Sequence, residues 1–267
     1  MDSPGLIYLE TALRRVVLAS VCIVLFAACS PNPIGDTSGQ SKLATNCETV
    51  QHAGDPYTVC AFAIADDDIR LFHSDANDQP YLQFNTLERE LDEQGEVLVF
   101  AMNGGMYHED RRPVGFFRDQ FGDRASVNTN DGPGNFHLKP NGVFWLSGDE
   151  AGVTESETYL EREIDPIYAT QSGPMLVIDG ALHPGLNPDG TSHRRRNGVG
   201  VSADAQTVYF VISDAAVTFY DFATLFRDTI GVPNALFLDG QVSRIFAPQI
   251  NRNEIGSDLG PIVGVVE

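Results

Sequence analysis

The chain has 267 residues, and 37 Asp and Glu against 17 Lys and Arg give it a formal net charge of −20. A protein this acidic repels polyanions, which argues against nucleic acid or a bare anionic membrane surface as a partner. The roughly 220 residues from Cys47 onward are enough for one domain with its own core, and they need no second domain.

The first 29 residues predict export. Arg14 and Arg15 precede an apolar run from Val16 to Ala28. A run of about 13 residues is typical of a signal peptide and too short for a membrane span, which needs about 20. Cys29 follows small residues as in a bacterial lipobox, where the cysteine is lipidated, although Phe26 stands where an aliphatic residue is usual and leaves ordinary cleavage near Ala28 as the alternative. Either route predicts a periplasmic protein or an outer-membrane-anchored lipoprotein.

Residues 30–46 are rich in Ser, Thr, Gly, Pro and Asn, and this composition predicts a flexible tether. The folded domain is therefore expected over residues 47–267. Its two cysteines, Cys47 and Cys60, are expected to form a disulfide in an oxidising compartment. Two buried free thiols are the alternative.

Residues 57–64 and 69–73 are apolar and rich in β-formers, and with Asp66–Asp68 between them they predict a hairpin. Asn85 and Glu88 match a capping box and predict the start of a helix that ends at Gly95. Further along the chain, Thr218 and Asp221 predict a second helix with an apolar stripe from Phe219 to Ile230.

Continuous apolar runs predict strands that are buried on both faces. They lie at residues 97–102, 143–146, 175–178, 208–212, 235–238 and 261–266. With about ten strands and two or three helices irregularly interleaved, the pattern predicts a single α+β domain with mixed, strongly twisted sheets.

Polar residues gather where these buried strands begin or end. Asn103, Ser172, the segment His193–Asn197 and Asp239 all occupy such positions. Each one alone also fits an ordinary tight turn, because Asn, Asp, Ser and Gly are the usual turn residues. Their repeated association with buried strands predicts that several of them converge at one rim of a sheet.

Arg196 and Asp239 have the clearest chemistry. Arg196 adjoins a buried strand and ends the densest basic cluster of this acidic chain, so it is expected to bind an anion such as phosphate or carboxylate, whereas Arg194 and Arg195 are expected to be solvated. Asp239 ends a buried strand, where a carboxylate serves as a nucleophile or general base, or simply as a turn residue. The histidine and cysteine spacings match no metal site, and no cofactor fingerprint is present.

At these turns the chain resembles the phosphodiester glycosidase family. Five short motifs carry the resemblance, in the family's order: Asn103-Gly104-Gly105-Met106-Tyr107, Lys139-Pro140-Asn141-Gly142-Val143-Phe144, Gln171-Ser172-Gly173-Pro174-Met175-Leu176-Val177, Arg196-Asn197-Gly198-Val199-Gly200 and Leu238-Asp239-Gly240. The stretch Asn128–Phe136 resembles a bacterial branch of the family. The family commonly continues Asp-Gly with further glycines and Ser, whereas this chain has Gln241-Val242-Ser243.

The resemblance implies a hydrolase that cleaves a sugar-phosphodiester bond, with Asp239 and Arg196 as catalytic residues and no cofactor. It places substrate contacts at Asn103, Gly104, Lys139, Asn141, Ser172, Gly173 and Gly240. The implied partner is a phosphorylated glycan, with the membrane reached through the lipid on Cys29. Two alternatives stay open: a lipid-anchored module that binds phosphorylated glycan without cleaving it, and a purely structural lipoprotein.

Overall fold

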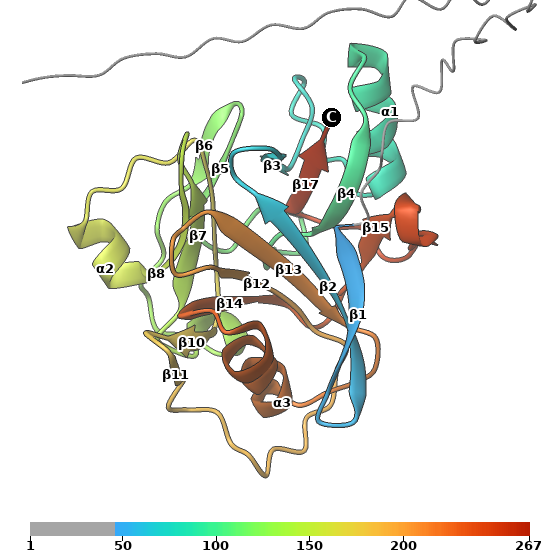
Figure 1. Cartoon of the computed structure of the whole chain (residues 1–267). Coiled ribbons are helices and arrows are strands. Elements are labelled where there is room, and N and C mark those ends of the chain that lie inside the picture. Colours follow the sequence, from blue (N-terminus) through green and yellow to red (C-terminus); the bar gives the residue numbers. More distant parts are fainter. Residues whose placement is uncertain (1–45) are drawn as a thin grey trace, which may run out of the picture. The chain divides into compact units, whose positions relative to one another are not determined.

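Three antiparallel sheets surround one hydrophobic core in the computed structural model, which describes residues 46–267 (Figure 1). The leader, Cys29 and the tether up to residue 45 lie outside the described residues, so what the sequence predicts for them stays a prediction. Within residues 46–267, no helix is long and apolar enough to cross a membrane.

The central sheet has seven strands in the order β1-β2-β13-β12-β14-β10-β11. Their bounds are β1 Cys47–His52, β2 Asp55–Ala63, β10 Met175–Ile178, β11 Ala181–Leu182, β12 Asn197–Val201, β13 Thr207–Ser213 and β14 Asn234–Asp239. In the middle of the sheet, β12 pairs on one side with β13 and on the other with β14. The end of β14 therefore lies beside the start of β12.

Two five-stranded sheets complete the β structure. The first has the order β16-β15-β4-β17-β3, with β3 Asp68–Phe72, β4 Leu98–Asn103, β15 Ile245–Ala247, β16 Arg252–Asn253 and β17 Ile262–Val266. The second has the order β6-β5-β9-β7-β8, with β5 Phe117–Asp119, β6 Gly122–Ala125, β7 Gly142–Leu146, β8 Ala151–Glu155 and β9 Tyr168–Ser172.

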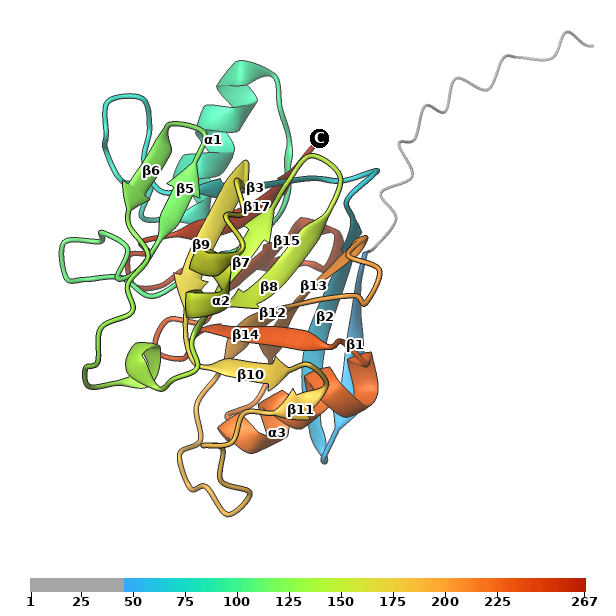
Figure 2. The ribbon, with the colours of Figure 1, turned by 90° about the vertical axis from the view of Figure 1, so that its left-hand side faces the viewer.

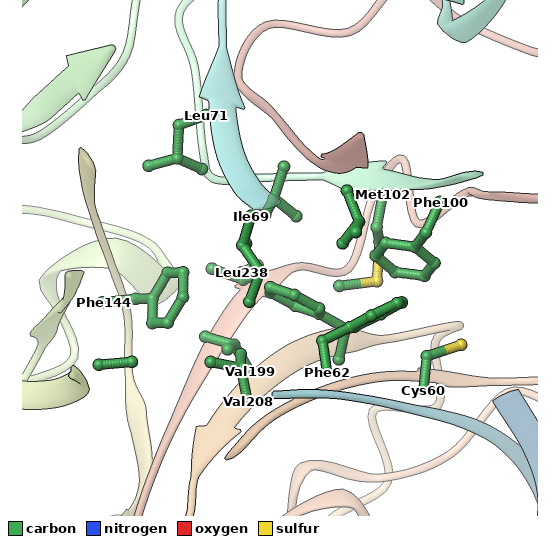
Figure 3. Packing of buried hydrophobic residues seen from close by; sticks show 14 of the residues in the cluster. Cys60, Phe62, Ile69, Leu71, Phe100, Met102, Phe144, Val199, Val208 and Leu238 are labelled. Carbon is green, nitrogen blue, oxygen red and sulfur yellow. The ribbon is translucent and has the colours of Figure 1, made fainter. Parts of the chain in front are cut away.

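The inner faces of all three sheets meet in the core shown in Figure 3. Phe62 and Val199 come from the central sheet, Phe100 from the first five-stranded sheet and Phe144 from the second. Because both faces of most of these strands are covered, their side chains are apolar at successive positions rather than at alternate ones. All six residues of β4 and all five of β7 are buried. The apolar runs 97–102 and 143–146 predict this burial correctly except at Val97, which precedes β4 and is exposed.

One α-helix covers the outer face of each sheet. The first, α1 (Phe84–Gln94), packs on β4, α2 (Ser156–Glu161) packs on β7 and β8, and α3 (Phe219–Thr224) packs on the central sheet (Figures 1 and 2). A π-helical turn, η2 (Leu225–Ile230), continues α3 up to Gly231. Short 3-10 turns occur at η1 (Asn135–His137) and η3 (Pro248–Ile250).

The α+β prediction is confirmed, together with the number of helices. The sheets are antiparallel, whereas the sequence predicted mixed ones: every pairing between the named strands of residues 46–267 is antiparallel. The disulfide between Cys47 and Cys60 is also confirmed, and these residues face each other across β1 and β2. Thr218 caps α3 as predicted, because its hydroxyl accepts a hydrogen bond from the Asp221 amide.

Two local predictions are wrong. The expected hairpin does not form, because β2 pairs on both edges with β1 and β13, and β3 pairs with β17 in another sheet. The capping box at Asn85 also fails. Helix α1 begins earlier, at Phe84, and its N-cap Gln83 makes no capping hydrogen bond through its side chain, because burial of Phe84 beneath the sheet sets the start of the helix. The helix does end at Gly95, whose φ is 81°.

Candidate active site

Asp239 and Arg196 lie at the same end of neighbouring strands. Asp239 is the last residue of β14 and pairs with Asn197, the first residue of β12, directly after Arg196. Phe237 belongs to the apolar cluster beneath α3, and the register of β14 with β12 shifts between Phe237 and Asp239. The central carbon of the Arg196 guanidinium lies 3.6 Å from the centroid of the Phe219 ring at the start of α3. Asp239 and Arg196, far apart in sequence, line the same pocket.

Arg196 is a buried cation held by neutral groups. It is 1% exposed, and its Nε and Nη2 donate hydrogen bonds to the carbonyls of Val217 (3.0 Å) and Ser192 (2.8 Å). Among residues 46–267 it has no carboxylate partner. Burial, assisted by the nearby cation of Arg194, lowers the pKa of Arg196 to about 10, so the guanidinium keeps its charge at neutral pH. An uncompensated buried cation of this kind is suited to bind an anion.

Asp239 is a largely desolvated carboxylate with one oxygen fixed. It is 7% exposed, and Oδ1 accepts hydrogen bonds from the amides of Gly240 (2.6 Å) and Gln241 (2.8 Å). Burial raises the pKa of Asp239, and the backbone amides oppose that rise. Because its pKa is raised, the Asp239 carboxylate is a stronger base than an exposed carboxylate. It is therefore suited to act as a nucleophile or general base.

Both side chains open into one pocket of about 770 Å³. A Cβ placed on Gly240 would lie 2.8 Å from Phe237 Cζ, so the close approach of this ring requires glycine beside Asp239. Three segments supply most of the remaining wall, namely the loop after β4, the turn around η1 and the chain that precedes Arg196. Their lining residues are Met106, Tyr107, His108, Glu109, Arg111, Val114, Pro133, Gly134, Asn135, Phe136, His137, Ser192 and Arg194, joined by Gln241 and Val242 after Asp239.

The predicted convergence of Asn103 and Ser172 with Asp239 occurs, but behind the pocket. The Asn103 side chain donates to Asn197 Oδ1 (3.1 Å) and accepts from the Arg244 amide (3.0 Å). Ser172 donates to the carbonyl of Leu238 (3.0 Å), the residue before Asp239. These fully buried side chains tie together the strand ends that carry Asp239, and they do not line the pocket.

The other predicted contacts hold the pocket loops. Asn141 donates to the carbonyl of Phe136 (3.0 Å), and a Cβ on Gly173 would lie 2.7 Å from that same oxygen. Lys139 binds Asp131 (2.8 Å) and the carbonyl of Thr129 (2.7 Å), which closes the loop before η1. Gly104 packs against the backbone of Ile262, where a Cβ would approach to 2.9 Å. Of the seven predicted substrate contacts, only Gly240 lines the pocket itself.

The basic cluster divides into three environments. Arg196 is buried, Arg194 lines the pocket and is exposed, and Arg195 forms a bidentate ion pair with Glu254 at 2.7 and 2.8 Å. The expectation of a solvated Arg195 is therefore wrong, because the half-buried Glu254 neutralises it. The sequence interpretation also missed Tyr107, Glu109, Arg111 and His137. The signal for Tyr107, Glu109 and Arg111 was a concentration of ionisable residues soon after the buried strand β4, whereas His137 lies in η1 and had no such signal.

Within residues 46–267, no group of three or more His, Cys, Asp and Glu side chains is arranged to hold a metal ion. A desolvated carboxylate beside a cation without a carboxylate partner, in one pocket, is an arrangement typical of hydrolases that act on anionic substrates.

Comparison with known proteins assigns the chain to a family. Residues 96–260 match the model of the phosphodiester glycosidase family. The uncharacterized protein YigE of Escherichia coli (strain K12) is 32% identical over 235 residues, which cover 88% of this chain and 85% of YigE. The chain therefore belongs to the phosphodiester glycosidase family, and this membership indicates a glycosidase-type function.

Two solved structures share the fold. The catalytic domain of zebrafish N-acetylglucosamine-1-phosphodiester alpha-N-acetylglucosaminidase, auto-inhibited by its pro-peptide, aligns with a TM-score of 0.54 at 11% identity and covers 82% of this chain and 81% of that one. A hypothetical protein from Synechocystis aligns with a TM-score of 0.53 at 13% identity, over 82% of this chain. This chain spans 61% of the Synechocystis chain.

Proposed function

We propose that the protein hydrolyses the bond between a sugar and a phosphodiester in envelope or extracellular glycoconjugates. The observation that carries the proposal is the shared pocket of Asp239, a desolvated carboxylate, and Arg196, a buried cation without a carboxylate partner among the described residues. A sugar linked to phosphate needs both groups, one for the anomeric carbon and one for the phosphate oxygen.

In this reaction the bond between the anomeric carbon and the phosphate oxygen breaks. Its electron pair leaves with the phosphate monoester, a stable anion that needs little proton donation. Asp239 assists either by activating water as a general base or by first binding the anomeric carbon, and the water oxygen ends on that carbon. The Nη1 group of Arg196 faces the charge that develops on the leaving phosphate.

The pocket also holds a second carboxylate. Glu109 lines it, together with the histidines His108 and His137. Turnover needs a group that takes a proton from the attacking water and a route that returns it to solvent, and ionisable side chains in the pocket can supply both, whereas a groove that only binds glycan needs neither. This favours an enzyme over the alternative, a lipid-anchored module that binds phosphorylated glycan without cleaving it.

We further propose that the protein acts outside the cytoplasm, in the periplasm or anchored to the outer membrane through a lipid on Cys29. The leader sequence supports export, and the disulfide between Cys47 and Cys60 supports an oxidising compartment, where such bonds persist.

The test is release of free sugar from a synthetic N-acetylglucosamine phosphodiester by the purified protein, compared with Asp239→Asn. We expect release by the native protein and a loss of at least about a thousandfold in the variant. Asp189→Asn, which removes an exposed carboxylate outside the pocket lining, is the matched control. Absence of release from the native protein, with phosphorylated glycan bound equally by the native protein and Asp239→Asn, would replace the hydrolase with the binding module.

A further inference from the structure

Arg196 would bind a phosphate with part of its donors already in use. Its Nε and one N–H of Nη2 donate to the carbonyls of Val217 and Ser192, which leaves the second N–H of Nη2 and the two N–H groups of Nη1 for a ligand. A phosphodiester has two non-bridging oxygens that share its negative charge, and each accepts more than one hydrogen bond. One partly engaged guanidinium does not supply all of these hydrogen bonds, so a second cationic donor in the pocket would complete the contact.

We propose that Arg111 is this second donor and determines the preference of the site for phosphorylated ligands, an inference that rests on the proposed function. Arg111 lines the pocket, and its guanidinium carbon lies 5.4 Å from the centroid of the Tyr107 ring. Its carboxylate neighbour, Asp258, is 4.0 Å away, at the limit of an ion pair. The side chain is 32% exposed, so its N–H groups remain accessible to a ligand.

The aromatic platform beneath Arg111 is itself fixed. The Tyr107 hydroxyl donates to the carbonyl of Asp258 at 2.8 Å, which sets the orientation of the ring. Burial raises the pKa of Tyr107, the negative charge of Asp239 raises it further, and the cation of Arg111 acts in the opposite direction. The charges of Arg111 and Asp239 therefore both act on the Tyr107 hydroxyl, and all three residues line the same pocket.

The backbone of Arg111 is held in a conformation that its side chain disfavours. Its φ is 73°, in the left-handed region, where a residue with a Cβ is less stable than glycine by about 1–2 kcal/mol. Its amide donates to the carbonyl of His108 (2.8 Å), and its own carbonyl accepts from Nε2 of the buried His73 (2.9 Å). Among the residues at positive φ in the described chain, Arg111 is the non-glycine that lines the pocket. A strained arginine at a position that suits glycine indicates a side chain kept for function.

Neighbouring arginines do not offer the same geometry. Arg194 lines the pocket, but it is exposed and its Nη1 donates to the carbonyl of the adjacent His193 at 2.9 Å. Arg112 does not line the pocket, and its side chain is 74% exposed and paired with Asp110 at 2.7 Å. Arg112 is therefore a matched control, one residue away, for any effect of general charge.

The experiment measures binding of inorganic phosphate and of neutral N-acetylglucosamine to the purified protein and to Arg111→Gly, Arg111→Lys and Arg112→Gly, with thermal unfolding of each. We expect Arg111→Gly to bind phosphate at least tenfold more weakly, to bind the neutral sugar within twofold of the native protein, and to unfold at a higher temperature than Arg112→Gly. Arg111→Lys keeps the charge and should bind phosphate with intermediate affinity. Arg112→Gly should bind phosphate within twofold of the native protein.

Phosphate binding by Arg111→Gly equal to that of the native protein would overturn the inference, and so would absence of phosphate binding by the native protein. Equal losses of phosphate affinity in Arg111→Gly and Arg112→Gly would show that the loss comes from the change in net charge, and this result would also overturn the inference. A native protein that binds phosphate through Arg111 but releases no sugar from the phosphodiester would leave this inference standing and remove only the proposed hydrolysis.

Discussion

Replacing Asp239 with Asn should make the protein more stable at neutral pH while it removes activity. Asn has the same shape, and its Oδ1 can still accept the hydrogen bonds that Gly240 and Gln241 donate to Asp239. What the substitution removes is a negative charge in a largely desolvated position. Because burial raises the pKa of Asp239, the ionised carboxylate lowers the stability of the native protein.

The sign of this effect fixes its pH dependence. Below the pKa of an unfolded aspartic acid, about 3.9, both states are protonated and the native protein bears no cost. The cost grows as the pH rises towards the raised pKa of the folded state, and it is complete above that pKa. Each tenfold difference in proton affinity between the folded and unfolded states is worth about 1.4 kcal/mol. We therefore expect Asp239→Asn to be more stable than the native protein at pH 7 and to match it near pH 3, with the difference at pH 7 reporting the size of the pKa shift.

The assay is urea unfolding of both proteins at intervals from pH 3 to pH 8. Asp189→Asn measures what the loss of one exposed charge contributes to a chain with a net charge of −20. A native protein more stable than Asp239→Asn at pH 7 would refute the reasoning, since it would mean that the backbone amides outweigh desolvation. A gap between the two that does not change with pH would refute it equally, because the effect would then have no titrating origin.

Three further predictions test the site and its support. Arg196→Lys should lower kcat/KM for a phosphodiester by about a hundredfold and spare neutral glycosides, because lysine cannot bind the carbonyls of Val217 and Ser192 and a ligand together; equal losses on both substrates would contradict this role. Reduction of the disulfide closed by Cys60 should lower the free energy of unfolding by about 3 kcal/mol in denaturant titrations, and an unchanged midpoint would refute it. Gly200→Ala should lower the free energy of unfolding by about 1–3 kcal/mol, measured in the same way, because its Cβ would lie 2.8 Å from Val232 Cγ2; no loss would show that Val232 can move aside without cost.

The fold class could be predicted from the sequence because the signals for buried strands and for helix ends lie within short stretches of the chain. The first five residues of β4 are apolar, and Gly95 and Gly231 end their helices in the left-handed conformation that glycine favours. Pairing partners could not be read in the same way. The turn at Asp66–Asp68 looks like a hairpin turn, yet it carries the chain from the central sheet to another, since β13 already occupies the edge of β2.

Asp239 and Arg196 were predictable because each stands at the boundary of an apolar strand, where a polar residue is conspicuous. Their proximity was not, since it depends on the pairing of Asn197 with Asp239 across β12 and β14. Nor could the sequence tell which arginine of the basic cluster would be free. That depends on Glu254, which is 59 residues from Arg195 along the chain and neutralises it. Within the basic cluster, Arg196 is then the buried arginine that has no carboxylate partner among the described residues.

The pocket wall illustrates a more general limit. Asn103 and Ser172 occupy motif positions, yet their side chains are engaged in hydrogen bonds that connect β4 to β12 and β9 to β14. The residues that face the ligand space, Tyr107 and Arg111, come from a loop with no regular period. Polar side chains at buried strand ends form hydrogen bonds with the surrounding backbone and side chains, because buried polar groups need hydrogen-bond partners. The loops beyond them are free to present unsatisfied donors, so affinity for substrate is expected to depend most on Arg111 and on the loop that carries it.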